Sequence, residues 1–225
     1  MAKTFTKIGK EITIAVKQGG PDVVGNSRLR ALMAEARSEN MPKDNVEKAI
    51  KRALEKNQGD FKEVVFEGYG PHGIAYLVET ATDNNTRTVA NVRSYFTKCG
   101  GSLGTSGSVS FMFDHKCVFR IKYQEGMDID ELQLALCECD DDPEVFIEEQ
   151  EDKDENITKN VVIYGAYESY GAIQKYIEDN GYELVSGGFE RIPNVELKDV
   201  TPEQRETLDK LTGLLEDDDD VTNVY

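Results

Sequence analysis

The chain has 225 residues, of which 39% are hydrophobic and 31% charged, and its formal net charge is −17. This size and composition fit a folded protein of one large or two to three small domains. No run approaches the roughly 18 apolar residues of a membrane helix, and the N-terminus lacks the apolar stretch of a secretory signal. Because the four cysteines are too few and too irregular for a disulfide framework, we expect a cytoplasmic protein without membrane contact.

The charge is unevenly distributed along the chain. Residues 1–58 hold 12 Lys and Arg against 7 Asp and Glu, a net of +5, whereas the remaining 167 residues hold 14 against 36, a net of −22. Such asymmetry indicates a basic module attached to an acidic body.

The basic module reads as three short helices. Apolar residues recur at helical spacing over 5–16, and the Gly-Gly-Pro at 19–21 ends that run. Asn26 or Ser27 caps a second helix, and Pro42 suits the first turn of a third. Three amphipathic helices with short connections predict a small bundle.

Strand patterns follow after the third helix. Residues 61–66 and 74–82 are rich in β-branched and aromatic residues, and a helix follows over 89–96. The glycine- and serine-rich segment 100–108 then leads into an expected strand at 109–113.

The next part has the ferredoxin-like order βαββαβ. Its expected strands and helices are, in order, 117–123, 130–139, 144–149, 160–164, 168–180 and 183–190. A last helix opens with a capping box at Thr201 and Gln204, and a short strand ends the chain. One helix and one strand cannot bury a core alone, so we expect them to return to the sheet of residues 60–115.

The predicted fold class is therefore α+β and multidomain: an N-terminal three-helix bundle, then an α+β domain with an inserted ferredoxin-like domain. The expected boundaries are 1–58 for the basic bundle, 60–115 plus 193–225 for the discontinuous α+β domain, and 116–192 for the insertion.

Few residues suggest catalysis or metal binding. His72 lies in a turn without a nucleophile pattern beside it. His115 and Cys117 with Cys137 and Cys139 have spacings unlike a zinc knuckle. We therefore expect a protein that is not an enzyme and holds no metal or cofactor.

The segment 100–108 follows a helix and precedes a strand, the reverse of a nucleotide-binding loop, and lacks its Gly-Lys-Ser/Thr ending. It is either a plain connection or a loop whose backbone N–H groups touch a phosphate or an RNA backbone. The run of aspartates 217–220 favours a solvated, repulsive acidic surface over a weak cation site.

The strongest physical signal is a lysine stripe on the first helix. At 100° per residue, Lys3, Lys7, Lys10 and Lys17 fall within an arc of about 80° opposite the apolar face. The stripe is either ordinary solubilising charge or a surface that faces phosphates, and the second interpretation requires ammonium groups free of carboxylates. Lys7→Glu with Lys10→Glu should then weaken binding to DNA or rRNA.

Seven segments of the chain, taken together, are similar to the sequence of one known family. They are FTKIGKEI (5–12), NSRLR (26–30), NMPKDNVEKAIKRA (40–53), FEGYGPHGIAYLVE (66–79), TDNNTRTVANVR (82–93), GGSLGTSGSVSFMF (100–113) and the terminal DDDDVTNVY. In this order they resemble the YebC/PmpR family, which includes the mitochondrial translational activator of cytochrome c oxidase.

The resemblance implies three domains and a regulator of gene expression that binds nucleic acid. The regulator would be a DNA-binding transcriptional regulator or, alternatively, a ribosome-associated translation factor that contacts rRNA and helps synthesis through proline-rich stretches. Family members usually carry a basic arm of about twenty residues before the Phe-Thr-Lys segment. If that arm is absent, each phosphate contact that is lost lowers the slope of log affinity against log salt concentration by about one, and binding to nucleic acid is weaker.

The loop 82–88 adds hydrogen-bonding side chains at the start of a helix, where phosphates are attracted. The candidate nucleic-acid-binding residues are Lys3, Lys7, Lys10, Lys17, Arg28, Arg30, Lys43, Lys48, Lys51, Arg52, Asn84, Asn85, Arg87 and Arg93. A protein-interaction adaptor remains an alternative of another class. We expect a monomer with DNA or the ribosome as partner and no small-molecule substrate.

Overall fold

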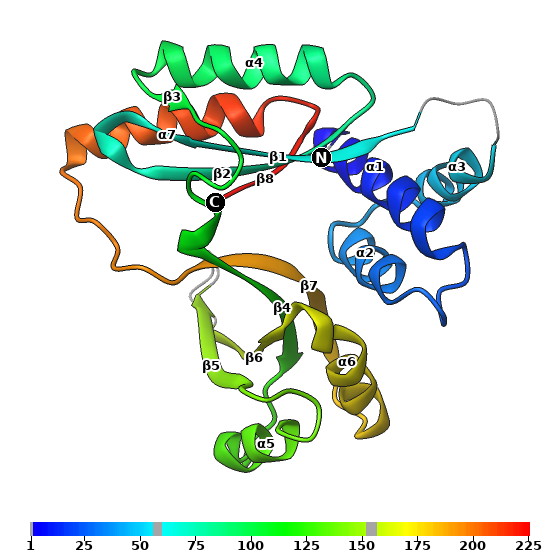
Figure 1. Cartoon of the computed structure of the whole chain (residues 1–225). Coiled ribbons are helices and arrows are strands. Elements are labelled where there is room, and N and C mark those ends of the chain that lie inside the picture. Colours follow the sequence, from blue (N-terminus) through cyan, green and yellow to red (C-terminus); the bar gives the residue numbers. More distant parts are fainter. Residues whose placement is uncertain (1, 56–59, 152–156) are drawn as a thin grey trace. The chain divides into compact units, whose positions relative to one another are not determined.

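The computed structural model describes residues 2–55, 60–151 and 157–225 (Figure 1). The chain begins with three helices and continues into an α+β region with two four-stranded sheets. The predicted fold class is therefore confirmed. None of the helices in the described part is both long and apolar enough to cross a membrane.

The N-terminal helices are α1 (Ala2–Gly19), α2 (Ser27–Ser38) and α3 (Lys43–Leu54). Gly20 follows α1 with a left-handed φ of 83°, which explains why the helix stops there. Asn26 caps α2, since its side chain accepts from the backbone N–H of Leu29 at 3.0 Å.

The first sheet has the strand order β3-β1-β2-β8, and its neighbours are antiparallel. Helices α4 and α7 lie on one face of it (Figure 1) and supply Phe96 and Leu211 to its core. The last strand pairs with β2, so the C-terminal segment rejoins this sheet. The elements of this part are β1 (Lys62–Tyr69), a 3-10 turn (Pro71–Gly73), β2 (Ala75–Thr82), α4 (Asn85–Lys98), β3 (Ser102–Leu103), α7 (Pro202–Glu216) and β8 (Val221–Val224).

The second sheet has the order β5-β6-β4-β7, which with its βαββαβ chain order is the ferredoxin-like topology. Its core brings Phe119 and Ile163 of the sheet against Leu136 and Ile173 of its two helices. Its elements are β4 (Phe113–Lys122), α5 (Ile129–Leu136), β5 (Glu144–Glu151), β6 (Ile157–Ala166), a 3-10 turn (Tyr167–Ser169), α6 (Tyr170–Asp179) and β7 (Leu184–Pro193).

The contacts divide the chain into two compact units, one of residues 1–22, 41–114 and 193–225, the other of 23–40 and 115–192. Helix α2 belongs to the second, where Ala31 joins the core. An apolar stripe shows that one face of a helix is buried, but it does not show which other elements bury it. From sequence alone, α2 is therefore grouped with its neighbours α1 and α3. The predicted domain boundaries thus stay a prediction, and the one at residue 58 lies outside the described residues.

One expected strand has a different structure. Residues 109–113 were predicted as a strand, but Ser110–Met112 form a 3-10 turn and β4 begins at Phe113. The reason is a contact with a residue distant in sequence: the backbone N–H groups of Val109 and Ser110 donate to the Glu67 carboxylate, not to a neighbouring strand.

Candidate nucleic-acid interface

The lysines of α1 contact the end of α7 within the first unit. Lys3 Nζ donates to Asp217 Oδ1 at 2.8 Å, Lys7 Nζ to the carbonyl of Glu216 at 2.7 Å, and Lys10 Nζ to the carbonyl of Asp219 at 2.8 Å. Cations at a helix C-terminus satisfy its free carbonyls and its partial negative charge. Lys3 and Lys7 therefore contact the carbonyls at the end of α7, and Lys10 contacts the segment just after it. Lys17 instead forms an ion pair with Asp60.

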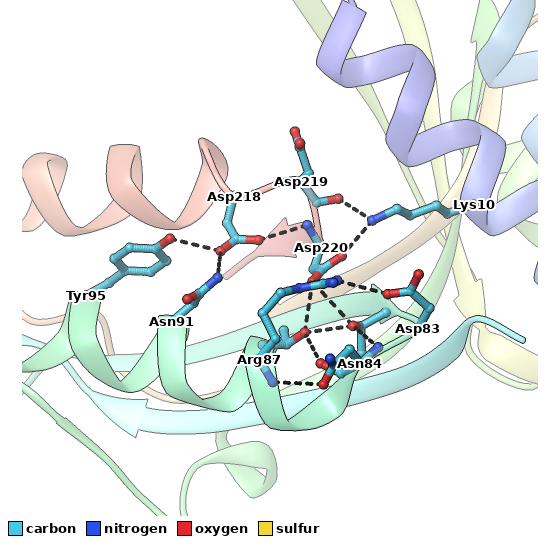
Figure 2. Close-up of polar contacts among 11 residues, drawn as sticks. Lys10, Asp83, Asn84, Arg87, Asn91, Tyr95, Asp218, Asp219 and Asp220 are labelled. Atoms are coloured by element: carbon cyan, nitrogen blue, oxygen red, sulfur yellow. Dashed lines mark hydrogen bonds and ion pairs between the residues drawn. The ribbon is translucent and has the colours of Figure 1, made fainter. Parts of the chain in front are cut away.

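Asp220 is the centre of this contact (Figure 2). Its side chain is buried, and it accepts from Lys10 Nζ at 2.7 Å, Arg87 Nη2 at 2.6 Å and Thr88 Oγ1 at 2.9 Å. Burial disfavours the charged carboxylate, but these hydrogen bonds outweigh it and hold the Asp220 pKa at about 2, below the ordinary 3.8. At Asp220, the run of aspartates 217–220 therefore pairs with a lysine of the same chain, Lys10.

Asp218 makes further contacts with α4, which already holds Arg87 and Thr88. Its carboxylate accepts from Tyr95 Oη at 2.9 Å and from Asn91 Nδ2 at 3.1 Å (Figure 2). Burial, and then the hydrogen bond to Asp218, raise the pKa of Tyr95 to about 12. In the predicted solvated acidic surface, three of the four aspartates 217–220 thus have side-chain partners. These partners lie more than a hundred residues away in sequence, so no local pattern reveals them.

The requirement that the stripe lysines be free of carboxylates is not met for Lys3, Lys10 and Lys17. Their predicted role in binding nucleic acid stays a prediction. The double exchange Lys7→Glu with Lys10→Glu is a poor test of it, since it would place carboxylates against the α7 carbonyls and Asp220 and so destabilise the unit.

Several other candidate nucleic-acid-binding residues are also buried or make contacts within the folded chain. Arg30 donates to the carbonyls of Val23 and Val24, Arg28 is half-buried, and Arg87 pairs with Asp83 and Asp220. Asn84 caps α4. Asn85 and Arg93 are exposed on that helix.

Helix α3 presents three of the candidate cations that are exposed without an ion pair to a described residue, and Arg93 on α4 is another. Lys43, Lys48 and Lys51 are exposed, and no ion pair joins them to any residue in the described part of the chain. Arg52 instead packs its guanidinium carbon 4.4 Å from the centre of the Phe61 ring. Most of the exposed candidate cations without an ion pair to a described residue therefore lie on α3.

The glycine-rich loop is organised by a buried carboxylate that sequence reasoning missed. Glu67 accepts from the backbone N–H groups of Gly107, Val109 and Ser110, each at 2.8 Å. Burial would raise the pKa of Glu67, but these bonds outweigh it and the pKa is lowered. Because Glu67 takes these N–H groups, they are not free for a phosphate. The available sequence signal was a glutamate directly after the apolar run 64–66 of a strand.

Replacing Glu67 by Ala is expected to lower the free energy of unfolding by about 2 kcal/mol, because three N–H groups lose their acceptor. Amide hydrogen exchange at Gly107, Val109 and Ser110 should accelerate. Since the folded pKa is depressed, the contribution is present above the ordinary 4.5 and is lost as pH falls below it. Exposed Glu63 on the same strand supplies the control; equal exchange in wild type and Glu67→Ala would contradict the assignment.

The groups considered for metal chemistry do not come together. Cys117 is buried and Cys137 exposed, and His115 stacks on Tyr167 with ring centres 4.2 Å apart. His72 occupies a turn with a left-handed φ of 64°. Among the described residues, no group of three or more potential ligands is placed to hold a metal ion.

Comparison with known proteins covers almost the whole chain. Residues 1–56 match the family model described as the TACO1/YebC protein N-terminal domain, and residues 61–225 match the TACO1/YebC second and third domain. Over 225 residues the chain is 59% identical to a protein of Parabacteroides distasonis and 56% to one of Bacteroides thetaiotaomicron, covering 100% of this chain and 88% of each relative. Both are named probable transcriptional regulatory proteins.

A solved structure shows the same fold. The crystal structure of the conserved hypothetical protein Aq1575 from Aquifex aeolicus superposes with a TM-score of 0.79 at 32% sequence identity. The match covers 100% of this chain and 88% of that one.

Proposed function

The chain belongs to the TACO1/YebC family, and on this basis we propose that it is a non-enzymatic regulator of gene expression that acts in the cytoplasm by binding nucleic acid. The observation that carries the proposal is the set of exposed cations on α3. Lys43, Lys48 and Lys51 are presented to solvent by a chain whose net charge is −17. Where a surface is otherwise acidic, a local group of lysines is suited to phosphates.

The names of the relatives support transcriptional regulation. We infer duplex DNA as the ligand in that case. A second candidate, a ribosome-associated translation factor that contacts rRNA, is favoured by the side chains themselves. Base edges in a groove are read mainly by Arg, Asn and Gln, and also by Lys. On α3, Arg52 packs on Phe61, Asn45 is half-buried and the exposed cations are lysines. Lysine contacts with the backbone of either nucleic acid do not read sequence.

The test compares the two ligands directly. Fluorescently labelled promoter duplexes and rRNA fragments are titrated at about 50 mM salt and again at about 200 mM, because phosphate contacts weaken steeply over that range. Sucrose-gradient sedimentation of a low-salt lysate then shows whether the protein travels with ribosomes. Tight binding to one duplex with no ribosomal fraction supports the transcriptional role, and the reverse supports the translational one. Absence of binding to both nucleic acids would refute the proposal and favour a protein-interaction adaptor.

A further inference from the structure

A groove of about 410 Å³ lies between α1 and α3 in the first unit. Its apolar lining comes from Phe5, Met41, Ala49 and Phe61. Helix α1 contributes Gly9 to the same wall, and the absence of a side chain there leaves the space open. The volume is in the range of pockets that hold small organic groups.

Polar and charged groups surround this apolar floor. Lys48 and Asn45 of α3 line the groove, and Arg52 lies over the Phe61 ring. Lys10 Nζ is 5.5 Å from the centre of the same ring. Arg52 Nε is buried without an acceptor among the described residues. The groove therefore has an aromatic ring, the side-chain amide of Asn45 and a net positive charge among its lining residues.

We propose that this groove receives the base of one unpaired nucleotide, while Lys48 contacts its phosphate. A nucleobase has apolar faces, hydrogen-bonding edges and an attached negative charge, and these three features match Phe61, Asn45 and Lys48. Proteins that bind single strands combine aromatic side chains with cations in this way. The inference rests on the proposed function and deepens it, because it favours single-stranded nucleic acid over a duplex, whose bases are stacked and cannot enter.

The groove can be filled without changing any charge. A Cβ added at Gly9 would meet only Met41 Cε, at 4.0 Å, and Gly9 lines the groove, so we expect the side chain of Gly9→Leu to extend into it. Leu is also a better helix former than Gly, and we expect a melting temperature no lower than that of wild type. Gly213→Leu on α7 is the matched control, because nothing lies within 4 Å of a Cβ there.

The probe is a single-stranded oligouridylate of about 12 nucleotides, followed by fluorescence anisotropy at several salt concentrations. Gly9→Leu is expected to weaken binding about tenfold, the effect of losing one stacked base. The slope of affinity against salt should not change, since no phosphate contact is removed. Gly213→Leu should bind as wild type does, and a duplex of equal length should bind both Gly variants equally.

Three results would overturn the inference. Wild-type affinity in Gly9→Leu would show that the groove is not used and would leave the proposed function intact. An equal loss in Gly213→Leu would show that the effect is not specific to the groove. A wild-type protein that binds no nucleic acid would remove the proposed function and the groove together. If Gly9→Leu does not fold, Asn45→Leu on the opposite wall makes the same test.

Discussion

Replacing Asp220 by Ala is expected to lower the free energy of unfolding by about 3 kcal/mol, the cost of removing one partner from a buried ion pair. The variant leaves Lys10, whose side chain is only 11% exposed, without its carboxylate, and it also removes the acceptor of Thr88 and Arg87. For a chain of this size the melting temperature should fall by about 10 °C. Calorimetry or thermal circular dichroism measures the change.

Asp219→Ala provides the control, because it alters the neighbouring aspartate. Asp219 is exposed and receives Lys10 through its backbone carbonyl, which the substitution keeps. Its effect should stay within about 0.5 kcal/mol. Equal stability of the two variants would show that Asp220 does not hold α1 to the end of α7.

The same residue predicts a pH dependence. The folded pKa of Asp220, about 2, is lower than the ordinary 3.8, so the unfolded chain binds the proton more readily. Its contribution is complete above the ordinary value and is lost as the pH falls from there through the folded pKa. Urea unfolding at successive pH values should show the gap between wild type and Asp220→Ala narrowing over this interval. A constant gap would contradict the assigned ionisation.

Local signals allowed most of the fold to be predicted. Asn26 and Thr201 marked helix starts through their capping side chains, and both caps are present. The alternation of strands and helices gave the βαββαβ order, which the second sheet confirms. These features depend on neighbours close in sequence, so composition and periodicity are enough to find them.

The candidate interface was harder to predict, because whether a charged side chain is free or paired depends on residues that are distant in sequence. Lys7 and Glu216 are 209 positions apart, and only the folded chain brings them together. Helical periodicity correctly places the α1 lysines on one face but does not show that α7 ends against it. Glu67 was missed for the same reason, since its three partners lie 40 to 43 residues further along.

Reversing the charge of Lys48 and Lys51 together should weaken nucleic-acid binding roughly 50-fold at low salt, since two attractions to phosphate become repulsions. Both side chains are exposed on α3 and form no ion pair with a described residue, so the fold should keep its stability. The slope of log affinity against log salt should fall by about 1.5, or 0.7 to 0.9 for each lost contact. Titration of rRNA and duplex DNA over a salt series measures both quantities.

Lys175→Glu with Lys210→Glu makes the same change in net charge at exposed positions on α6 and α7. If long-range repulsion alone governed binding, this control would lose as much affinity as the α3 variant. We expect it to lose little and to keep the salt slope, because neither lysine lies on α3 and no phosphate contact is assigned to either. Equal losses in the two double variants would place the contact surface elsewhere than α3, whereas a loss confined to Lys48 and Lys51 locates the phosphates on that helix.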